Sequence, residues 1–326
     1  MAPQIVDLRQ LEARQFTPLL EAESEAWGEH LRWDFTASLR VISSCLQENR
    51  LSGSALLGDQ GVEGYCFFFL DGEKGLIGDL FVLSGPAALD RAQQLLGQTL
   101  RGLMASSRLR RVEAQLPHFT LEQLDPSFRA HCFTGYRRRF MAVSLLNRPR
   151  PAQPSAANPF RPGSSSPHAD FVIRPWERLY DQDAAQLLYS AYRNHVDAII
   201  NDQYASLAGA TRLIENIVQQ QGCGAYLPYA SRVAIHQSTQ RLAGILALTA
   251  VQGQTAHIPQ VAVANQFQGT GVGTVLLESV FEELIKRDFR EVSLTVTDLN
   301  AGAVRLYERL GFETFRTFGA FVWTRP

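Results

Sequence analysis

The sequence predicts an α/β (α+β) fold arranged as two similar domains, and three features predict it. A glycine-rich turn at residues 268–274 separates a strand-like run from an amphipathic run, which is the pattern of a strand leading into a helix. The two halves of the chain present strands and helices in the same order. A segment rich in proline and serine separates these halves.

The first half is predicted to contain three strands, a helix and a closing strand pair. Residues 64–70, 75–82 and 111–116 read as strands. Residues 133–143 close the half. A helix between the second and third strands is predicted by apolar residues three or four positions apart, which are Ala92, Leu96, Leu100 and Leu103.

The second half repeats this order after a linker. Residues 147–168 are rich in proline and serine and poor in apolar residues, so a semi-extended linker is expected there. The predicted domains are therefore 1–146 and 169–326. The second domain is expected to form strands, a helix at 274–287 and a closing segment; the strands are 242–251, 255–263 and 291–297.

The glycine turn at residues 268–274 has the properties of a phosphate-binding loop. Glycine lets a ligand approach the backbone closely, and the positive end of the helix dipole favours an anion. The turn is not a Walker A loop, because no Gly-Lys-Ser/Thr follows. It is not a dinucleotide fingerprint either, because the third glycine of that pattern would fall at Thr274. The alternative is a plain turn that uses glycine for its positive φ.

Four motifs together resemble the GCN5-related N-acetyltransferase (GNAT) superfamily. They are Val261-Ala262-Val263, Gln268-x-x-Gly271-x-Gly273, Asn300-Ala301, and the run from Leu306 to Phe312. The resemblance covers about residues 171–326. It implies two tandem GNAT-like domains, each with a mixed, mostly antiparallel central sheet flanked by helices. It also implies direct transfer of an acetyl group from acetyl-CoA to a primary amine of a small molecule or a protein.

The resemblance implies that the backbone of the second half binds acetyl-CoA as co-substrate. The N–H groups of the turn would hold the pyrophosphate, and the pantetheine arm would pair with the edge of a splayed strand. Asn300 would contact the cofactor, or it would only cap the helix that follows. The expected cofactor-binding residues are Val261, Val263, Gln268, Gly269, Thr270, Gly271, Val272, Gly273, Thr274 and Asn300.

Tyr307 and His257 are the candidate catalytic residues. A phenol stays protonated at neutral pH, so Tyr307 can pass its proton to the departing thiolate, or its ring can simply belong to the core. His257 lies where many relatives carry a carboxylate base, and a neutral imidazole can accept a proton. The alternative for His257 is a strand histidine that merely lines the cleft.

The segment from Tyr189 to Tyr204 is expected to recognise the acceptor, because the matching region covers the acceptor in this superfamily. The alternative is a helix with an ordinary solvated face. Asp197 and Asp202 are candidates for holding a cationic amine. The polar residues within reach are Tyr192, His195, Asp197, Asp202 and Tyr204.

The first half lacks the motifs that would bind acetyl-CoA. Residues 83–88 contain no Gln-x-x-Gly-x-Gly turn, and Pro86 removes one N–H that would face a phosphate. No Asn…Tyr pair precedes Gly135. We therefore expect a degenerate domain that braces the active half and walls the substrate cleft.

Composition limits the classes of partner. The net charge is −1, so no nucleic-acid footprint is expected, and no apolar stretch approaches the length of a membrane span. The four cysteines form no Cys-x-x-Cys pair, which favours reduced thiols in the cytoplasm and no metal site. The internal duplication favours a monomer.

Three functions remain open on the sequence. The first is an acetyl-CoA-dependent N-acetyltransferase. The second is another acyl transfer on a tandem GNAT frame, similar to mycothiol synthases. The third is a non-catalytic acetyl-CoA sensor, which would keep the phosphate turn but need neither Tyr307 nor a base.

Overall fold

The computed structural model describes residues 4–59, 61–148, 170–220 and 223–325. The chain divides into two compact units, one formed by Met1–Arg139 with Arg316–Pro326 and the other by Phe140–Phe315. Apart from Asn147 and Arg148, the predicted linker lies outside the described residues. Within the described ranges, no helix combines the length and the hydropathy that crossing a membrane requires.

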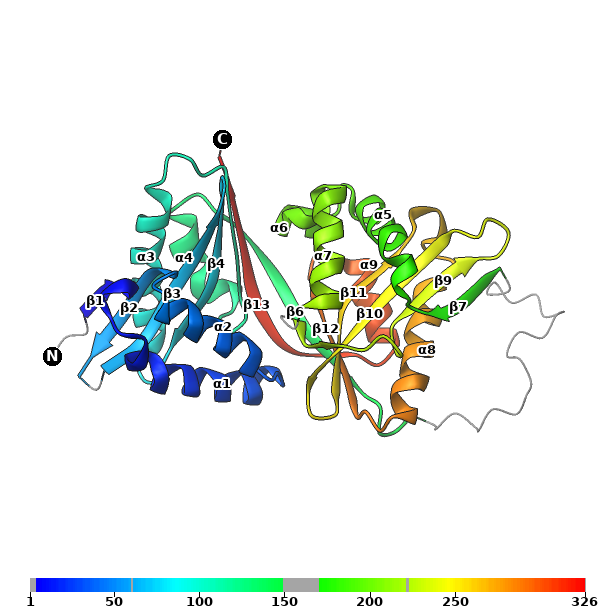
Figure 1. Cartoon of the computed structure of the whole chain (residues 1–326), viewed down its shortest axis with the longest axis horizontal. Coiled ribbons are helices and arrows are strands. Elements are labelled where there is room, and N and C mark those ends of the chain that lie inside the picture. The colour runs from blue at the N-terminus through cyan, green and yellow to red at the C-terminus, as the bar shows by residue number, and fades with distance from the viewer. Residues whose placement is uncertain (1–3, 60, 149–169, 221–222, 326) are drawn as a thin grey trace. The chain divides into compact units, whose positions relative to one another are not determined.

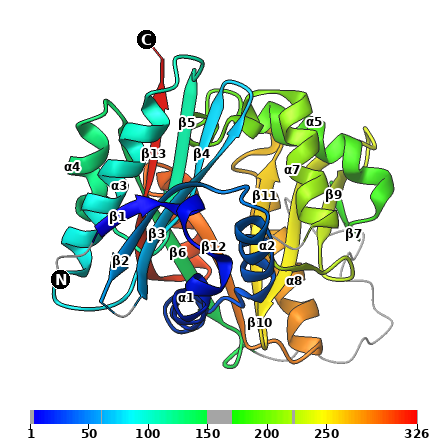
Figure 2. The same ribbon diagram turned by 60° about the vertical axis from the view of Figure 1, so that its left-hand side comes forward.

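The first unit is a sheet with helices on both faces. Its strands follow the order β1-β2-β3-β4-β5-β13, in which only β4 and β5 are parallel. Helices α3 and α4 lie side by side on one face (Figures 1 and 2), and α1 and α2 pack on the other. The strands are β1 (Gln4–Asp7), β2 (Ser52–Gly58), β3 (Gly61–Asp71), β4 (Lys74–Val82), β5 (Arg111–Leu116) and β13 (Glu313–Thr324). The helices are α1 (Thr17–Leu31), α2 (Thr36–Gln47), α3 (Ala88–Met104) and α4 (Leu121–Arg129).

The second unit repeats this topology. Its strand order is β7-β9-β10-β11-β12-β6, only β11 and β12 are parallel among the registers that the structure describes, and β8 (Ala225–Tyr226) pairs with β10. Helices α5 and α7 pack on one face, and α8 and α9 on the other. The strands are β7 (Phe171–Pro175), β9 (Arg232–His236), β10 (Leu242–Gln252), β11 (Thr255–Val263), β12 (Glu291–Thr297) and β6 (Thr134–Ser144). The helices are α5 (Asp181–Tyr192), α6 (Val196–Ile200), α7 (Leu207–Gln219), α8 (Val272–Lys286) and α9 (Ala301–Arg309). The predicted fold class, two mixed and mostly antiparallel sheets flanked by helices, is confirmed.

The compact units do not coincide with the predicted limits of 1–146 and 169–326, because two long strands each belong to both units. Strand β6 begins in the first unit, and its residues Met141 and Val143 are buried in the core of the second. Strand β13 begins in the second unit, and its part Gly319–Thr324 pairs with β5 of the first. Hydrophobic patterning marks where a strand lies but not which sheet it joins, because pairing partners are set by long-range contacts.

We expect residues 1–148 and 170–326, expressed as two separate chains, to co-purify as a complex. The sheet of the first unit takes β13 from the second piece, and the sheet of the second unit takes β6 from the first piece. Either piece alone would therefore leave a sheet edge unpaired. A tag on one piece followed by size-exclusion chromatography measures this. Ending the second piece at Phe315 should weaken recovery, because it removes the partner of β5. If each piece purified alone as a folded monomer, the shared-strand description would be wrong.

A buried carboxyl pair lies between α1 and the sheet of the first unit. Glu23 is 0% exposed and Asp79 5% exposed, and the Tyr65 hydroxyl donates to the Glu23 carboxyl group. Burial raises the pKa of Glu23 well above its ordinary value of 4.5, and the neighbouring Asp79 raises it further. Burial also raises the pKa of Asp79. The pair is therefore held at least partly protonated in the folded protein.

Replacing Glu23 by Gln is expected to stabilise the protein at pH 8 by about 1–3 kcal/mol and to have little effect near pH 4. A carboxyl group whose pKa is raised on folding contributes most stability below its unfolded pKa, and this contribution is lost as the pH rises through the folded pKa. Glutamine keeps the neutral shape and does not titrate. Denaturant melts of both proteins between pH 4 and pH 9 measure the difference. The exposed Glu25→Gln serves as control, and a difference that does not grow with pH would contradict this reading.

Candidate active site

The site begins where β11 and β12 separate. These parallel strands pair from Thr255↔Glu291 to Ile258↔Leu294, and their register ends there although both strands continue. The pairing of β11 with β10 is also irregular here. Its register shifts between Ala247↔Gln260 and Thr249↔His257, which is the position of a β-bulge. The end of β11 therefore presents a backbone edge that β12 does not cover.

The backbone of Val261 and Val263 points toward this open edge. The Ala264 N–H donates to the Ala243 carbonyl on the β10 side, at 2.9 Å. Since backbone groups alternate along a strand, those of Val261 and Val263 point the opposite way. The Val263 carbonyl accepts from Gln268 Nε2 at 3.3 Å, which ties the following turn to the strand edge.

The glycine turn leaves its N–H groups without a capping side chain. Gly269 has φ 78° and Gly271 has φ 91°, conformations that side chains with a Cβ rarely adopt. Gly271 is the N-cap of α8 and has no side chain to offer, so the N–H groups of the first helical turn lack intrahelical partners. The Thr270 hydroxyl bonds back to the Phe267 carbonyl at 2.7 Å. The turn thus presents a bare, positively polarised helix end.

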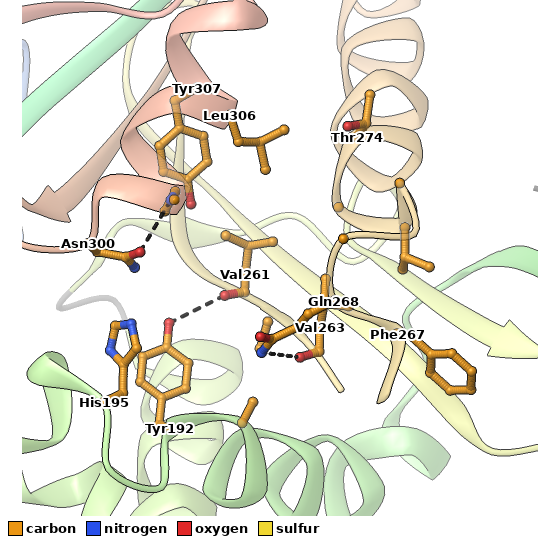
Figure 3. Close-up of a pocket in the computed structure, with 18 of the residues that line it drawn as sticks. Tyr192, His195, Val261, Val263, Phe267, Gln268, Thr274, Asn300, Leu306 and Tyr307 are labelled. Carbon is orange, nitrogen blue, oxygen red and sulfur yellow. Dashed lines mark hydrogen bonds between the residues drawn. The ribbon is translucent and has the colours of Figure 1, made fainter. Parts of the chain in front are cut away.

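The open strand edge and the bare turn line one cleft of about 540 Å³ (Figure 3). Helix α9 forms another wall with Ala303 and Leu306, and the end of α5 contributes Ala191 and Tyr192. Gly273 lies close to α9, because a Cβ placed there would be 3.5 Å from Leu306 Cδ2. The cleft is thus a slot between the end of β11 and α9, with the helix terminus at its side.

The comparisons with known proteins bear on this cleft. Residues 215–312 match the model of the Acetyltransferase (GNAT) family. The chain carries a GNAT domain. The matched range contains the open strand edge, the glycine turn and α9, whereas Ala191, Tyr192 and His195, which also line the cleft, precede it.

Curated relatives match short stretches of the chain. An uncharacterized N-acetyltransferase of Methanocaldococcus jannaschii is 42% identical over 60 residues, which are 18% of this chain and 26% of that protein. The [ribosomal protein bS18]-alanine N-acetyltransferase of Escherichia coli is 41% identical over 66 residues, 20% of this chain and 45% of that protein. The chain therefore spans less than half of the length of either relative.

Solved structures resemble the whole chain in fold. A GCN5-related N-acetyltransferase from Sphaerobacter thermophilus covers 99% of this chain and 96% of its own, with a TM-score of 0.61 and 17% identity. A tandem GNAT protein from the clavulanic acid biosynthesis pathway covers 99% of both chains, with a TM-score of 0.58 and 14% identity. At these low sequence identities the structural similarity establishes the fold alone.

Most residues predicted for the site meet at the GNAT cleft. Thr270 and His257 are not among the residues that line it. Those that do line it are Val261, Val263, Gln268, Gly269, Gly271, Val272, Gly273, Thr274, Asn300 and Tyr307.

Tyr307 combines the two alternatives that the sequence leaves open. Its ring is buried and packs edge-on against Phe312, with ring centroids 5.7 Å apart. Its hydroxyl points into the cleft (Figure 3). Burial and the Asp197 carboxylate raise its pKa, so the hydroxyl keeps its proton at neutral pH. Asn300 likewise has two roles open to it, because it caps α9 by accepting the Ala303 N–H at 3.2 Å and also lines the cleft.

His257 precedes, along β11, the point at which β11 and β12 separate. It pairs with Ser293 in the register of β11 and β12, and its Nδ1 lies 2.9 Å from the Ser293 hydroxyl. The side chain is 6% exposed. The spacing along β11 places His257 on the expected strand but in its paired part, away from the cleft lining.

The acceptor segment contributes Tyr192 and His195 to the cleft. The Tyr192 ring stacks on Tyr204 with centroids 4.2 Å apart, and Gln260 joins both hydroxyls, donating to Tyr192 at 2.9 Å and accepting from Tyr204 at 2.8 Å. Asp202 and Asp197 do not line the cleft, although Asp197 lies directly behind His195. The sequence analysis did not single out Arg309 or Phe267, which also line it; Arg309 follows Leu306 by three residues and so shares its helix face.

The first unit repeats the strand separation without the open edge. Strands β4 and β5 pair from Lys74↔Arg111 to Ile77↔Ala114, four pairs as in the second unit. The Leu83 N–H donates to the Glu63 carbonyl as the Ala264 N–H donates to the Ala243 carbonyl, so Leu83 corresponds to Ala264. Leu80, three residues before Leu83, therefore corresponds to Val261. The Leu80 N–H is already bonded to the Asp79 carboxylate at 2.7 Å.

Proposed function

We propose that the chain is an N-acyltransferase that uses acetyl-CoA and acetylates a primary amine of a small molecule or a protein. The observation that carries this proposal is the presence, in one cleft, of a strand edge that β12 does not cover, a helix terminus without a capping side chain, and a protonated tyrosine. An amide-rich pantetheine arm fits the strand edge, and a pyrophosphate fits the helix terminus. Membership of the GNAT family supports the same reaction class.

The roles of the residues follow from these positions. Acetyl-CoA, when bound, would supply the acyl thioester. The N–H groups of Gly269 and of residues 271–274 would hold its phosphates, whereas the Thr270 N–H already donates to the Phe267 carbonyl. The Val261 N–H would donate to the thioester oxygen as charge builds there. Tyr307 would give its proton to the leaving sulfur. The Tyr192 side of the cleft would hold the amine against the thioester, which lowers the barrier by proximity.

We propose that the first unit does not bind acetyl-CoA in this manner. The Leu80 N–H, which corresponds to the Val261 N–H, already donates to the Asp79 side chain. Pro86 lies in the turn where the second unit has glycines. Its role would then be to complete the shared sheets and support the GNAT domain.

Calorimetric titration of acetyl-CoA into the full chain tests the proposal. One site per chain is the expected result, and release of free thiol in the presence of a panel of primary amines identifies the acceptor class. Two sites would contradict the assignment of the first unit. Tight binding with no turnover on any amine would favour a sensor, and absence of binding would overturn the transferase proposal.

A further inference from the structure

The reaction needs a group that takes a proton from the acceptor amine, because the nitrogen that bonds to the acyl carbon must lose a proton to become an amide nitrogen. We propose that His195 is this group and that Asp197 orients its imidazole. The inference rests on the proposed function, since it assigns a residue to the same cleft.

Among the residues that line this cleft in the described part of the chain, four can carry or lose a charge: Tyr192, His195, Tyr307 and Arg309. Burial raises the pKa of both tyrosines, so neither is a phenolate at neutral pH. An arginine keeps its proton in proteins. His195 is therefore the lining residue able to accept a proton under ordinary conditions.

His195 stands on the acceptor side of the cleft. It is the N-cap of α6, and its ring packs beside Tyr192 with centroids 5.0 Å apart. Figure 3 shows the two rings on one side of the cleft, with Asn300 and Tyr307 on the opposite side and Val261 between them. An amine held beside His195 would face the thioester oxygen site at Val261.

Asp197 places two different groups next to the same ring nitrogen. Its backbone N–H donates to His195 Nδ1 at 3.1 Å, and its Oδ2 lies 3.5 Å from the same nitrogen without a hydrogen bond. The N–H favours a ring protonated on Nε2, whereas the carboxylate favours a proton on Nδ1 and leaves Nε2 free to act as base. The Thr297 hydroxyl donates to Oδ1 of Asp197, so Oδ2 is the oxygen available to the imidazole.

The step balances with the groups named. The ammonium form first gives one proton to bulk water, which leaves an electron pair on the nitrogen. The amine nitrogen then bonds to the acyl carbon as a second proton passes from it to His195 Nε2, and the Asp197 carboxylate stabilises the resulting imidazolium. The carbon–sulfur bond breaks, and Tyr307 gives its proton to the sulfur. The two residues exchange protons with bulk water after the products leave.

Nitrogen-15 NMR of the histidine rings in the full chain is the first test, with His195→Gln used to assign the signals. We expect His195 to carry its proton on Nδ1 at pH 7.5 with acetyl-CoA present, and Asp197→Asn to shift it to Nε2. A ring that stays protonated on Nε2 in the unsubstituted protein would overturn the proposal, because Nε2 could then not accept a proton from the amine.

Kinetics separate His195 from His257. With any amine that turns over, His195→Gln should lower kcat/KM by about 100-fold or more, with acetyl-CoA affinity unchanged. The reverse pattern, in which only His257→Gln lowers kcat/KM, would overturn the proposal. If the unsubstituted protein failed to bind acetyl-CoA, the proposed function would be wrong, and the NMR result would still decide the pairing of His195 with Asp197.

Discussion

A Gly271→Glu substitution is expected to weaken acetyl-CoA binding at least about 100-fold, which corresponds to about 2.7 kcal/mol. Gly271 has φ 91° and caps α8 directly beside the helix N–H groups that would receive the pyrophosphate. A carboxylate there would compete for the same N–H groups and repel the incoming anion. Calorimetry on the full chain measures the loss.

Two further variants separate charge from backbone strain. Gly271→Asn tolerates a left-handed conformation better than most residues and adds no charge, so it should lose less affinity than Gly271→Glu. Gly85→Glu introduces the same charge into the matching turn of the first unit, where a Cβ at Gly85 would meet no atom within 4 Å. Equal losses in Gly85→Glu and Gly271→Glu would place the cofactor elsewhere or in both units.

A Tyr307→Phe substitution should lower kcat by about 100-fold and leave the dissociation constant of acetyl-CoA within about threefold. The change removes only the hydroxyl, while the ring keeps its contact with Phe312. Since burial raises the pKa of Tyr307, the hydroxyl is a proton donor across the neutral range, and its loss should not be rescued by pH in that range. Steady-state kinetics together with calorimetry separate turnover from binding.

Tyr226→Phe is the matched control for Tyr307→Phe. Tyr226 is a tyrosine of the same unit that burial also affects, raising its pKa to about 12, but it is not among the residues that line the cleft. Its substitution should leave kcat unchanged. Unchanged turnover in Tyr307→Phe would remove this tyrosine as the acid and leave the thiolate to be protonated by water.

His257 and His195 show how far the sequence predicts the catalytic residues of the site. Counting along the strand led to His257, which is on β11 but within its paired part, where Ser293 faces it. His195 lies 66 residues from Val261 by number, and only the packing of α5 against β11 brings it to the cleft. The sequence marked its segment as acceptor-binding and named His195 among the polar residues of that segment, but it gave no signal for a role as base.

The loss of function predicted for the first unit has a second physical basis that motifs do not reveal. The sequence showed a missing glycine turn and Pro86. The structure adds that the Asp79 carboxylate bonds to the Leu80 N–H, which corresponds to the N–H expected to activate the thioester. Sequence alone does not indicate that the Asp79 side chain is buried beside its own strand, which is a property of the folded sheet.

The sequence by itself determined the fold class, the repeated order of elements and the glycine turn that opens α8. These are local properties, because periodicity and the demand of a turn for positive φ act over a few residues. Only the tertiary structure decided the ends of the two units, in which β6 and β13 each belong to both. It also decided which side chains share the cleft, because contacts between distant segments depend on how sheets and helices pack and leave no pattern within any one segment.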